Sequence, residues 1–167
     1  MQLRKFQETD AEQMAELLNN RNILDNLRDM IPYPYDAKDA LEFIESCQQE
    51  APQITFVIDI DGLPIGVIGL VLQEDIYKKS AEIGYWLGEP YWNHGYMTKA
   101  IGLMVDYGFN KLDLTRIFAG VFEYNKASRK VLEKAGFKFE GVFEKAVIKN
   151  GKLVDEYRYA VINPRYK

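Results

Sequence analysis

The chain has 167 residues, with 21 basic and 25 acidic side chains and a formal net charge of −4. This length favours one domain spanning residues 1–167, and a chain of this size buries roughly 70% of its extended surface on folding, enough for a core. The acidic balance argues against a dedicated nucleic-acid binder, which usually carries a basic face. Cys47 and His94 are single in the sequence, which excludes an intrachain disulfide, a cysteine-rich zinc site and a two-histidine metal site.

No apolar stretch approaches the roughly 20 residues that span a bilayer. Residues 1–14 have no apolar core of a signal peptide. We therefore expect a cytoplasmic, soluble protein that acts without a membrane, a nucleic acid or a metal, as a monomer or a homodimer.

Hydrophobic spacing predicts mainly helices in the first third of the chain. Residues 2–7 predict a short edge strand. Thr9 or Asp10 is placed to cap a helix that runs to about residue 20, and a second helical stretch continues to Met30. The run 31–35, Ile-Pro-Tyr-Pro-Tyr, breaks the helix because a proline disfavours helical geometry in the residue before it. Asp36 is placed to cap a further helix, in which Cys47 is predicted as a small core residue.

From residue 54 the spacing changes to that of strands. The predicted strands are 55–60, 63–72, 81–87, 114–121, 138–148 and 152–162. Asp61-Gly62 and Asn150-Gly151 predict two hairpin turns. Helices are predicted from Gly95 onward and over 125–135. The order of elements indicates one α/β domain with a mixed sheet covered by helices.

The junction between the strand 81–87 and the helix that follows is the first candidate site. The N–H groups at a helix start are unpaired and carry the positive end of the helix dipole, which makes an anion site. Gly95, expected in the first turn of this helix, has no side chain to obstruct a phosphate. The residues alone also allow Gly95 simply to ease a tight connection, and neither common nucleotide loop is present in the sequence.

A second candidate cluster opens the helix over 125–135. Asn125 is placed as its cap, and Ser128 lies one turn further on the same side. Four basic residues add positive charge near the two sites: Lys99, Lys126, Arg129 and Lys130. A ligand with several phosphates needs such local charge on an acidic protein. Capping alone, and a solvated basic face, are the alternative interpretations.

Four motifs resemble those of the Gcn5-related N-acetyltransferases and follow one another in the same order. They are AEIGYWL from Ala81, YWNHGYMTKA from Tyr91, NKAS from Asn125 and AGF from Ala135. Within that superfamily the chain is most similar to the RimJ/RimL type, the ribosomal-protein N-terminal acetyltransferases. The resemblance implies the acyl-CoA N-acyltransferase fold, which is α/β with a mixed, mostly antiparallel central sheet of about seven strands and helices on both faces.

The resemblance also implies acetyl-CoA as the donor and a primary amine, on a peptide or protein N-terminus or a small molecule, as the acceptor. The strand edge at Tyr85, Trp86 and Leu87 would pair with the pantetheine arm. The pyrophosphate would be held by the backbone amides of six residues: Asn93, His94, Gly95, Tyr96, Met97 and Thr98. Asn125 and Ser128 would contact the donor near its thioester.

Some positions depart from the wider family pattern. Trp92 and Met97 stand at the first and last positions of the phosphate-loop pattern, and Lys99 replaces a usual acidic residue. Many members place a tyrosine seven residues after the asparagine, as the acid for the departing thiolate, and here that position is Leu132. Ser128 is the remaining nearby hydroxyl, either as proton donor or only to orient the donor.

Direct attack of a neutral amine on the thioester benefits from a general base, and Glu82 is the candidate. A salt-bridged strand end is the alternative for Glu82, while His94 is disfavoured because it lies in the phosphate loop. Tyr33, Tyr35 and Tyr157 are candidates for the acceptor groove, or else for core or rim positions. A non-catalytic acyl-CoA-binding module is the alternative function, and a nucleotide-binding regulator is a third.

Overall fold

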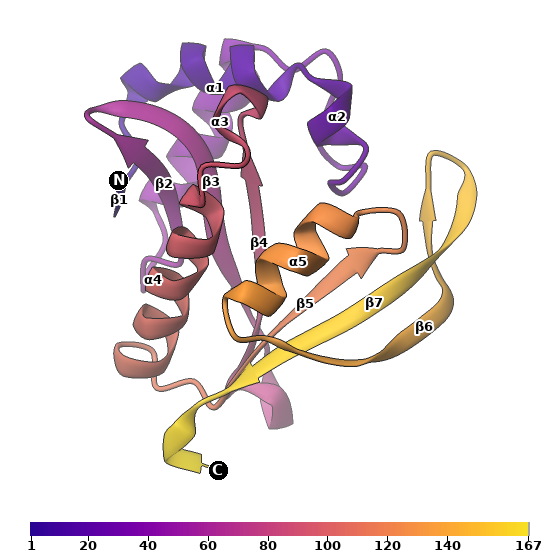
Figure 1. Ribbon diagram of the computed structural model, residues 1–167. Coiled ribbons are helices and arrows are strands. Elements are labelled where there is room, and N and C mark those ends of the chain that lie inside the picture. The colour runs from indigo at the N-terminus through magenta and orange to yellow at the C-terminus, as the bar shows by residue number, and fades with distance from the viewer. Residues whose placement is uncertain (167) are drawn as a thin grey trace. The chain divides into compact units, whose positions relative to one another are not determined.

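The computed structural model describes residues 1–166 and contains the predicted succession of strands and helices (Figure 1). Within these residues, seven strands are joined by hydrogen bonds in the order β1-β2-β3-β4-β5-β7-β6. The strands are Gln2–Arg4 (β1), Thr55–Ile60 (β2), Leu63–Leu72 (β3), Ser80–Leu87 (β4), Arg116–Phe122 (β5), Lys138–Lys149 (β6) and Lys152–Ile162 (β7). The α-helices are Ala11–Leu18 (α1), Arg21–Leu24 (α2), Ala37–Gln48 (α3), Tyr96–Asn110 (α4) and Lys126–Lys134 (α5).

The sheet is mixed and mostly antiparallel, as predicted. The ladders β1–β2, β2–β3, β5–β7 and β6–β7 are antiparallel, whereas β4 and β5 are parallel. Asp61-Gly62 joins β2 to β3, Asn150-Gly151 joins β6 to β7, and all four residues have positive φ. Positive φ at both central residues defines the type I′ turn, whose twist matches that of the flanking strands. Both hairpin predictions are confirmed.

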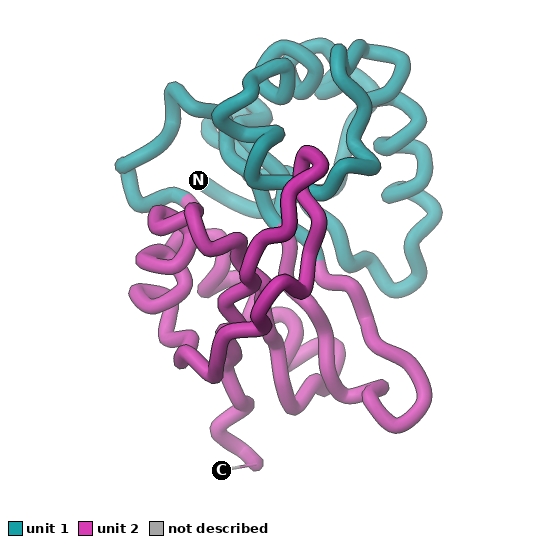
Figure 2. Tube along the Cα trace, turned by 90° about the vertical axis from the view of Figure 1, so that its right-hand side faces the viewer, with its two compact units in different colours: residues 1–69, 85–96 teal, residues 70–84, 97–167 magenta. Residues whose placement is uncertain are grey.

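The described residues form two compact units (Figure 2). Unit 1 comprises residues 1–69 and 85–96, and unit 2 comprises residues 70–84 and 97–167. The unit boundaries fall within β3 and β4, so each of these strands contributes residues to both units. The single domain expected over residues 1–167 stays a prediction.

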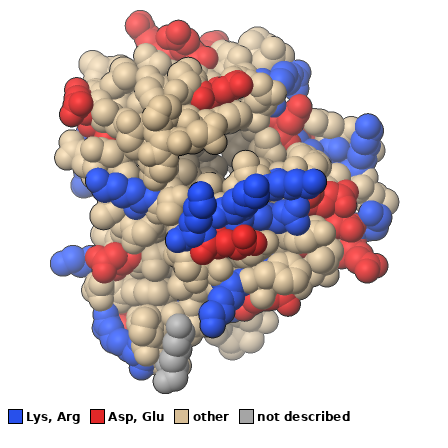
Figure 3. All heavy atoms as spheres, in the orientation of Figure 1, with Lys and Arg blue, Asp and Glu red and all other residues tan. Residues whose placement is uncertain are grey.

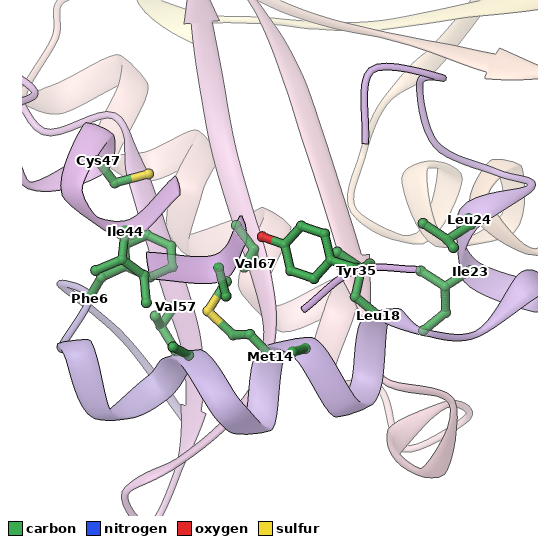
Figure 4. Packing of buried hydrophobic residues seen from close by; sticks show 13 residues of the cluster. Phe6, Met14, Leu18, Ile23, Leu24, Tyr35, Ile44, Cys47, Val57 and Val67 are labelled. Carbon is green, nitrogen blue, oxygen red and sulfur yellow. The ribbon is translucent and has the colours of Figure 1, made fainter. Parts of the chain in front are cut away.

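Unit 1 is organised around a buried hydrophobic cluster (Figure 4). Met14 of α1, Ile44 of α3 and Val57 of β2 are each at most 2% exposed. Cys47 lies in the same cluster, which confirms it as a core residue. Burial raises the pKa of the Cys47 thiol to about 11, and Glu50 acts in the same direction. Cys47 is therefore protonated at neutral pH and acts as a small hydrophobic residue.

In unit 2, α4 lies close against two strands because Gly108 has no side chain. A Cβ atom at Gly108 would stand 2.7 Å from Cδ1 of Ile117 and 3.3 Å from Cδ1 of Leu70. Side chains alternate along a strand, so Leu70 and Val67 point to opposite faces of β3. Val67 belongs to the cluster that α1 and α3 cover. Each unit therefore has helices packed on its own part of this strand, α1 and α3 in unit 1 and α4 in unit 2.

The second helical stretch is shorter than predicted. The helix α2 ends at Leu24, and the residues from there to Met30 form turns and bends. The side-chain amide of Asn26 donates to the Asn22 carbonyl at 2.9 Å, taking the acceptor that the next helical backbone N–H would use. The predicted Asp36 cap of α3 is confirmed, because its carboxylate accepts two backbone N–H groups.

Arg4 binds two buried carboxylates in unit 1. Its guanidinium donates to both oxygens of Asp10 at 2.8 Å, and its Nε donates to Asp59 at 2.7 Å. Thr9 or Asp10 was expected to cap α1, but the Asp10 side chain makes no such cap and accepts hydrogen bonds from Arg4 and from the Gln7 backbone N–H instead. Burial by itself raises the pKa of Asp59, but hydrogen bonds from Arg4 and from the Gly62 amide outweigh it and lower the pKa.

We expect Arg4→Leu to lower the free energy of unfolding by about 3–5 kcal/mol at neutral pH, because two buried carboxylates lose their charged partner. The stabilisation from Asp59 is present above the ordinary aspartate pKa of about 3.9 and is lost as pH falls through the lower folded-state pKa. The difference between wild type and variant should therefore shrink in acid. Urea unfolding at several pH values measures it.

Lys38→Met is the control for this prediction. Lys38 and Glu42 form an exposed pair, 3.8 Å apart, with side chains 83% and 67% exposed. Exposed pairs contribute little, so the change should stay within about 0.5 kcal/mol. Equal losses in the two variants would contradict a special role for Arg4.

Candidate functional site

The strand β4 carries the first group of predicted site residues. Ala81, Ile83 and Leu87 are buried. Because side chains alternate along a strand, Glu82 and Trp86 share the opposite face. Both are partly exposed, so Glu82 lies on a face of β4 that is only partly covered.

The pairing of β4 with β5 ends early within unit 2. The parallel ladder joins Ser80–Glu82 to Arg116–Phe118, although unit 2 contains β4 as far as Gly84 and all of β5. On its other edge, β5 pairs with β7 along its whole length. Among the described residues of unit 2, the β4-side edge of β5 therefore has no strand partner beyond Phe118.

Close contacts hold the end of β4 in unit 1. A Cβ atom at Gly66 of β3 would clash with the carbonyl oxygen of Trp86 and stand 3.0 Å from Cα of Leu87. The indole Nε1 of Trp92 donates to the Leu87 carbonyl at 2.7 Å. Trp86 and Trp92 also pack against the hydrophobic cluster. These contacts position the backbone of residues 85–87, the strand end that the resemblance predicts to pair with the donor.

The loop before α4 contains two residues in the left-handed region. Asn93 has a φ of +63° and Gly95 a φ of +77°, whereas His94 between them is not left-handed. Alternation of this kind turns successive N–H groups toward one side and forms an anion-binding nest. The helix begins at Tyr96, so Gly95 precedes it rather than lying in its first turn as expected. A positive φ is the reason that glycine suits this position.

This loop is anchored at its start and open at its turn. Glu89 accepts hydrogen bonds from the side-chain amides of Asn20 and Asn22 in unit 1. Residues 93–95 are exposed, and a Cβ atom at Gly95 would meet no atom within 4 Å. The first residues of α4, 96–98, carry N–H groups that have no carbonyl partner within the helix. The turn therefore has both the room and the donors that an anion needs.

Asn125 caps α5, as predicted. Its Oδ1 accepts the backbone N–H of Ser128 at 3.0 Å, which places Ser128 in the first turn. Leu132, where many relatives of the resembled family carry a tyrosine, is 0% exposed. A proton donor near the cap must therefore be found elsewhere, and Ser128 is the hydroxyl that the cap itself positions.

Basic side chains form a row over α5 (Figure 3). The helix contributes four of them: Lys126, Arg129, Lys130 and Lys134. The lysines are exposed, while the guanidinium of Arg129 lies 4.3 Å from the centre of the Tyr157 ring. The row gives an acidic chain the local positive charge that a ligand with several phosphates requires.

The three tyrosines suggested for an acceptor groove have different surroundings. Tyr35 is 6% exposed in the unit 1 cluster (Figure 4), and burial, with Asp39 acting in the same direction, raises its pKa to about 12. Tyr35 is therefore a core residue, which is one of the alternatives that the sequence allowed. Tyr33 is 53% exposed, with the Arg21 guanidinium 3.9 Å from its ring centre. Tyr157 is half-buried.

The predicted site residues divide between the two units. Unit 1 contains residues 85–96, the strand end and the loop, whereas unit 2 contains Glu82, Asn125 and Ser128. Sequence reasoning missed an ion pair on β7 of unit 2, formed by Glu156 and Arg158. The segment 155–160 resembles the RimJ/RimL type, but sequence reasoning assigned neither residue a role of its own.

The chain matches the acetyltransferase (GNAT) domain over residues 1–138. It is 39% identical over 60% of its length to the uncharacterized N-acetyltransferase YoaA of Bacillus subtilis (strain 168), covering 56% of that protein. The chain spans about half the length of the first curated relatives that it matches. The match over residues 1–138 shows that the chain belongs to the GNAT acetyltransferase family.

Two further relatives match nearly the whole chain. Spermidine N(1)-acetyltransferase of Escherichia coli (strain K12) is 25% identical over 99% of the chain and 88% of that protein. The structure of RimJ from Mycobacterium smegmatis in complex with CoA-disulfide has a TM-score of 0.84 at 25% identity, covering 98% of this chain and 82% of that one. RimL is another structural neighbour, which agrees with the RimJ/RimL-type resemblance.

Among residues 1–166, no helix is both long and apolar enough to cross a membrane. No group of three or more His, Cys, Asp or Glu side chains in that range is arranged to hold a metal ion.

We expect Gly66→Ala to destabilise the protein by about 1–3 kcal/mol, because the new methyl group must push away the Trp86 carbonyl. Thermal unfolding measures the loss. Gly102→Ala is the control, since a Cβ atom there would meet no atom within 4 Å and alanine favours the helix. A Gly66→Ala protein as stable as the control would show that β3 and β4 do not need this close approach.

Proposed function

We propose that this protein transfers the acetyl group of acetyl-CoA to a primary amine by direct attack in a ternary complex. The observation that carries the proposal is the early end of the β4–β5 ladder at Glu82 and Phe118. An extended chain can join a sheet at such an open edge through backbone hydrogen bonds, and the pantetheine arm of the donor is of that shape. Membership of the GNAT family supports the same donor.

The residues of the chain fit acetyl-CoA. The N–H groups of 93–98 would hold the pyrophosphate, because a nest and a helix start combine there. The edge of 85–87 would pair with the pantetheine arm. Asn125 and Ser128 would contact the donor near the thioester, and the basic row over α5 would favour its phosphates. No metal is needed for any of these contacts.

When bound, acetyl-CoA supplies the acyl thioester. Glu82 would take the proton that the acceptor ammonium must lose. The amine nitrogen would then bond to the carbonyl carbon as the C–S bond breaks. Ser128 would donate its proton to the departing thiolate and regain one as the nitrogen of the new amide releases its excess proton. A backbone N–H of Trp86 or Leu87 would stabilise negative charge on the carbonyl oxygen. Holding both substrates together supplies much of the rate enhancement.

The acceptor would be a peptide N-terminus or a small amine. One relative is named for spermidine, and RimJ and RimL are named among the structural neighbours. These names support a primary amine as the acceptor group. Experiment must identify the peptide or small molecule that carries it. Tyr33 stays a candidate for the acceptor groove, whereas Tyr157 packs against Arg129 on the sheet face opposite Glu82. The protein would act as a monomer or a homodimer in the cytoplasm.

The buried Leu132 favours one alternative, a non-catalytic acyl-CoA-binding module of the same fold. Release of free thiol from acetyl-CoA across a panel of amines separates the two functions. A module would bind acetyl-CoA and release no thiol with any amine.

Acetyl-CoA at 100 times its Kd should raise the free energy of unfolding by about 2.7 kcal/mol, and ATP should not. We expect Gly95→Trp to abolish this gain by filling the phosphate turn, with calorimetry as the direct measurement. Gly151→Trp is the matched control, since Gly151 also has a positive φ, +74°, and open space around its Cβ position. If both variants bind acetyl-CoA like wild type, the proposed phosphate site is wrong.

We expect Glu82→Gln to lower kcat about 10²-fold or more near neutral pH, because removing a general base costs this much. The loss should shrink as pH rises, since the amine then loses its proton without help. Initial rates from pH 6 to 10, together with the Kd of acetyl-CoA, test this. A uniform loss at every pH, or a weakened donor Kd, would give Glu82 a structural role instead.

A further inference from the structure

Glu156 and Arg158 lie on the same sheet face as Glu82. In the β5–β7 ladder, Glu156 pairs with Phe122 and Arg158 with Gly120. In the β4–β5 ladder, Glu82 pairs with Phe118. Paired residues, and every second residue along a strand, project to one face. The three charged residues therefore share one face of the unit 2 sheet.

The helices of unit 2 lie on the opposite face. Gly108 of α4 approaches Ile117, and the Tyr159 hydroxyl donates to Glu133 of α5 at 3.0 Å. Ile117 and Tyr159 alternate with the residues that share the face of Glu156. The face of Glu82 and Glu156 is thus the one that α4 and α5 do not cover.

The carboxylate of Glu156 reaches across from β7 onto β5. A Cβ atom at Gly120 would stand 2.5 Å from Cδ of Glu156 and 2.9 Å from its Oε1, so the carboxylate occupies the side-chain space of Gly120. Gly120 lies two residues beyond Phe118, where the ladder with β4 ends. The carboxylate is therefore held over the strand whose open edge would receive the donor.

Arg158 fixes this carboxylate in place. Its Nη2 donates to Oε1 of Glu156, and the two side chains are 23% and 13% exposed. The guanidinium lies 4.8 Å from the ring centre of Phe118 and 4.7 Å from that of Phe143. The two aromatic rings restrict the Arg158 side chain, and the ion pair with Arg158 restricts Glu156. The Glu156 carboxylate is therefore preorganised rather than mobile.

We propose that Glu156 binds the ammonium group of the acceptor, and that the enzyme prefers amines that are cationic when they bind. This inference rests on the proposed function, since it takes the open β5 edge as the place of the thioester. Arg158 binds one oxygen of this carboxylate, and the other oxygen, Oε2, can accept a hydrogen bond from an ammonium group. Glu82, on the same face, then removes the proton of the bound ammonium.

The test compares acetylation of spermidine, which is cationic at neutral pH, with that of methoxyamine, whose amino group is uncharged there. Glu156→Gln should raise the KM for spermidine about 10- to 100-fold, the range for a hydrogen bond to a charged group. The KM for methoxyamine and the Kd for acetyl-CoA should stay within about twofold of wild type. Gly120→Ala, which keeps the charge but displaces the carboxylate, should raise the spermidine KM in the same direction.

Glu140→Gln is the matched control. Glu140 pairs with Arg116, which lies on the same face of β5 but four residues from Gly120, about 13 Å along the strand. This variant loses a comparable ion pair and should keep the wild-type KM for both amines. Circular dichroism establishes that all three variants are folded.

The outcomes separate the two proposals. A wild type that does not bind acetyl-CoA overturns the proposed function and the inference with it. A wild type that binds acetyl-CoA and acetylates neither amine also overturns the proposed function, whereas one that acetylates methoxyamine but not spermidine overturns the inference alone. So does a Glu156→Gln protein that keeps its spermidine KM, or one whose KM rises equally for spermidine and methoxyamine.

Discussion

The parallel ladder between β4 and β5 stops after three residue pairs, and this ending shapes what unit 2 can do. Backbone N–H and C=O groups require partners, and an unpaired strand edge is a template for another extended chain. On its other edge, β5 is paired along its whole length by β7, which holds the strand in place. The strand β5 is thus held by β7 at one edge, while its other edge is open beyond Phe118. Such an open edge suits a long, thin donor such as acetyl-CoA.

The two faces of the unit 2 sheet carry different groups. The basic row belongs to α5, whose Arg129 and Glu133 contact Tyr157 and Tyr159 on one face. The carboxylates of Glu82 and Glu156 are on the other face, where Arg158 pairs with Glu156. In the proposed complex the donor phosphates would use the basic row and the acceptor amine the carboxylates, so the two substrates would not compete for the same charged residues.

Local features were predictable because a few adjacent residues decide them. The two hairpin turns, the Asp36 cap and the Asn125 cap each depend on groups within about four residues, and all are confirmed. The prediction was wrong where a side chain had a competing partner. Asp10 binds Arg4 instead of capping α1, and Asn26 takes a helix carbonyl and ends the helical geometry beyond α2.

By itself, the sequence determined the order of elements, the two hairpin turns and the cap that positions Ser128. Only the tertiary structure decided that β7 lies between β5 and β6, that the β4–β5 ladder ends at Glu82, and that Glu156 lies over Gly120. These features join residues 36 positions apart, or depend on which strands pair. Spacing along the chain carries the period of a strand but not the identity of its neighbour, because pairing is chosen by the packing of the whole sheet.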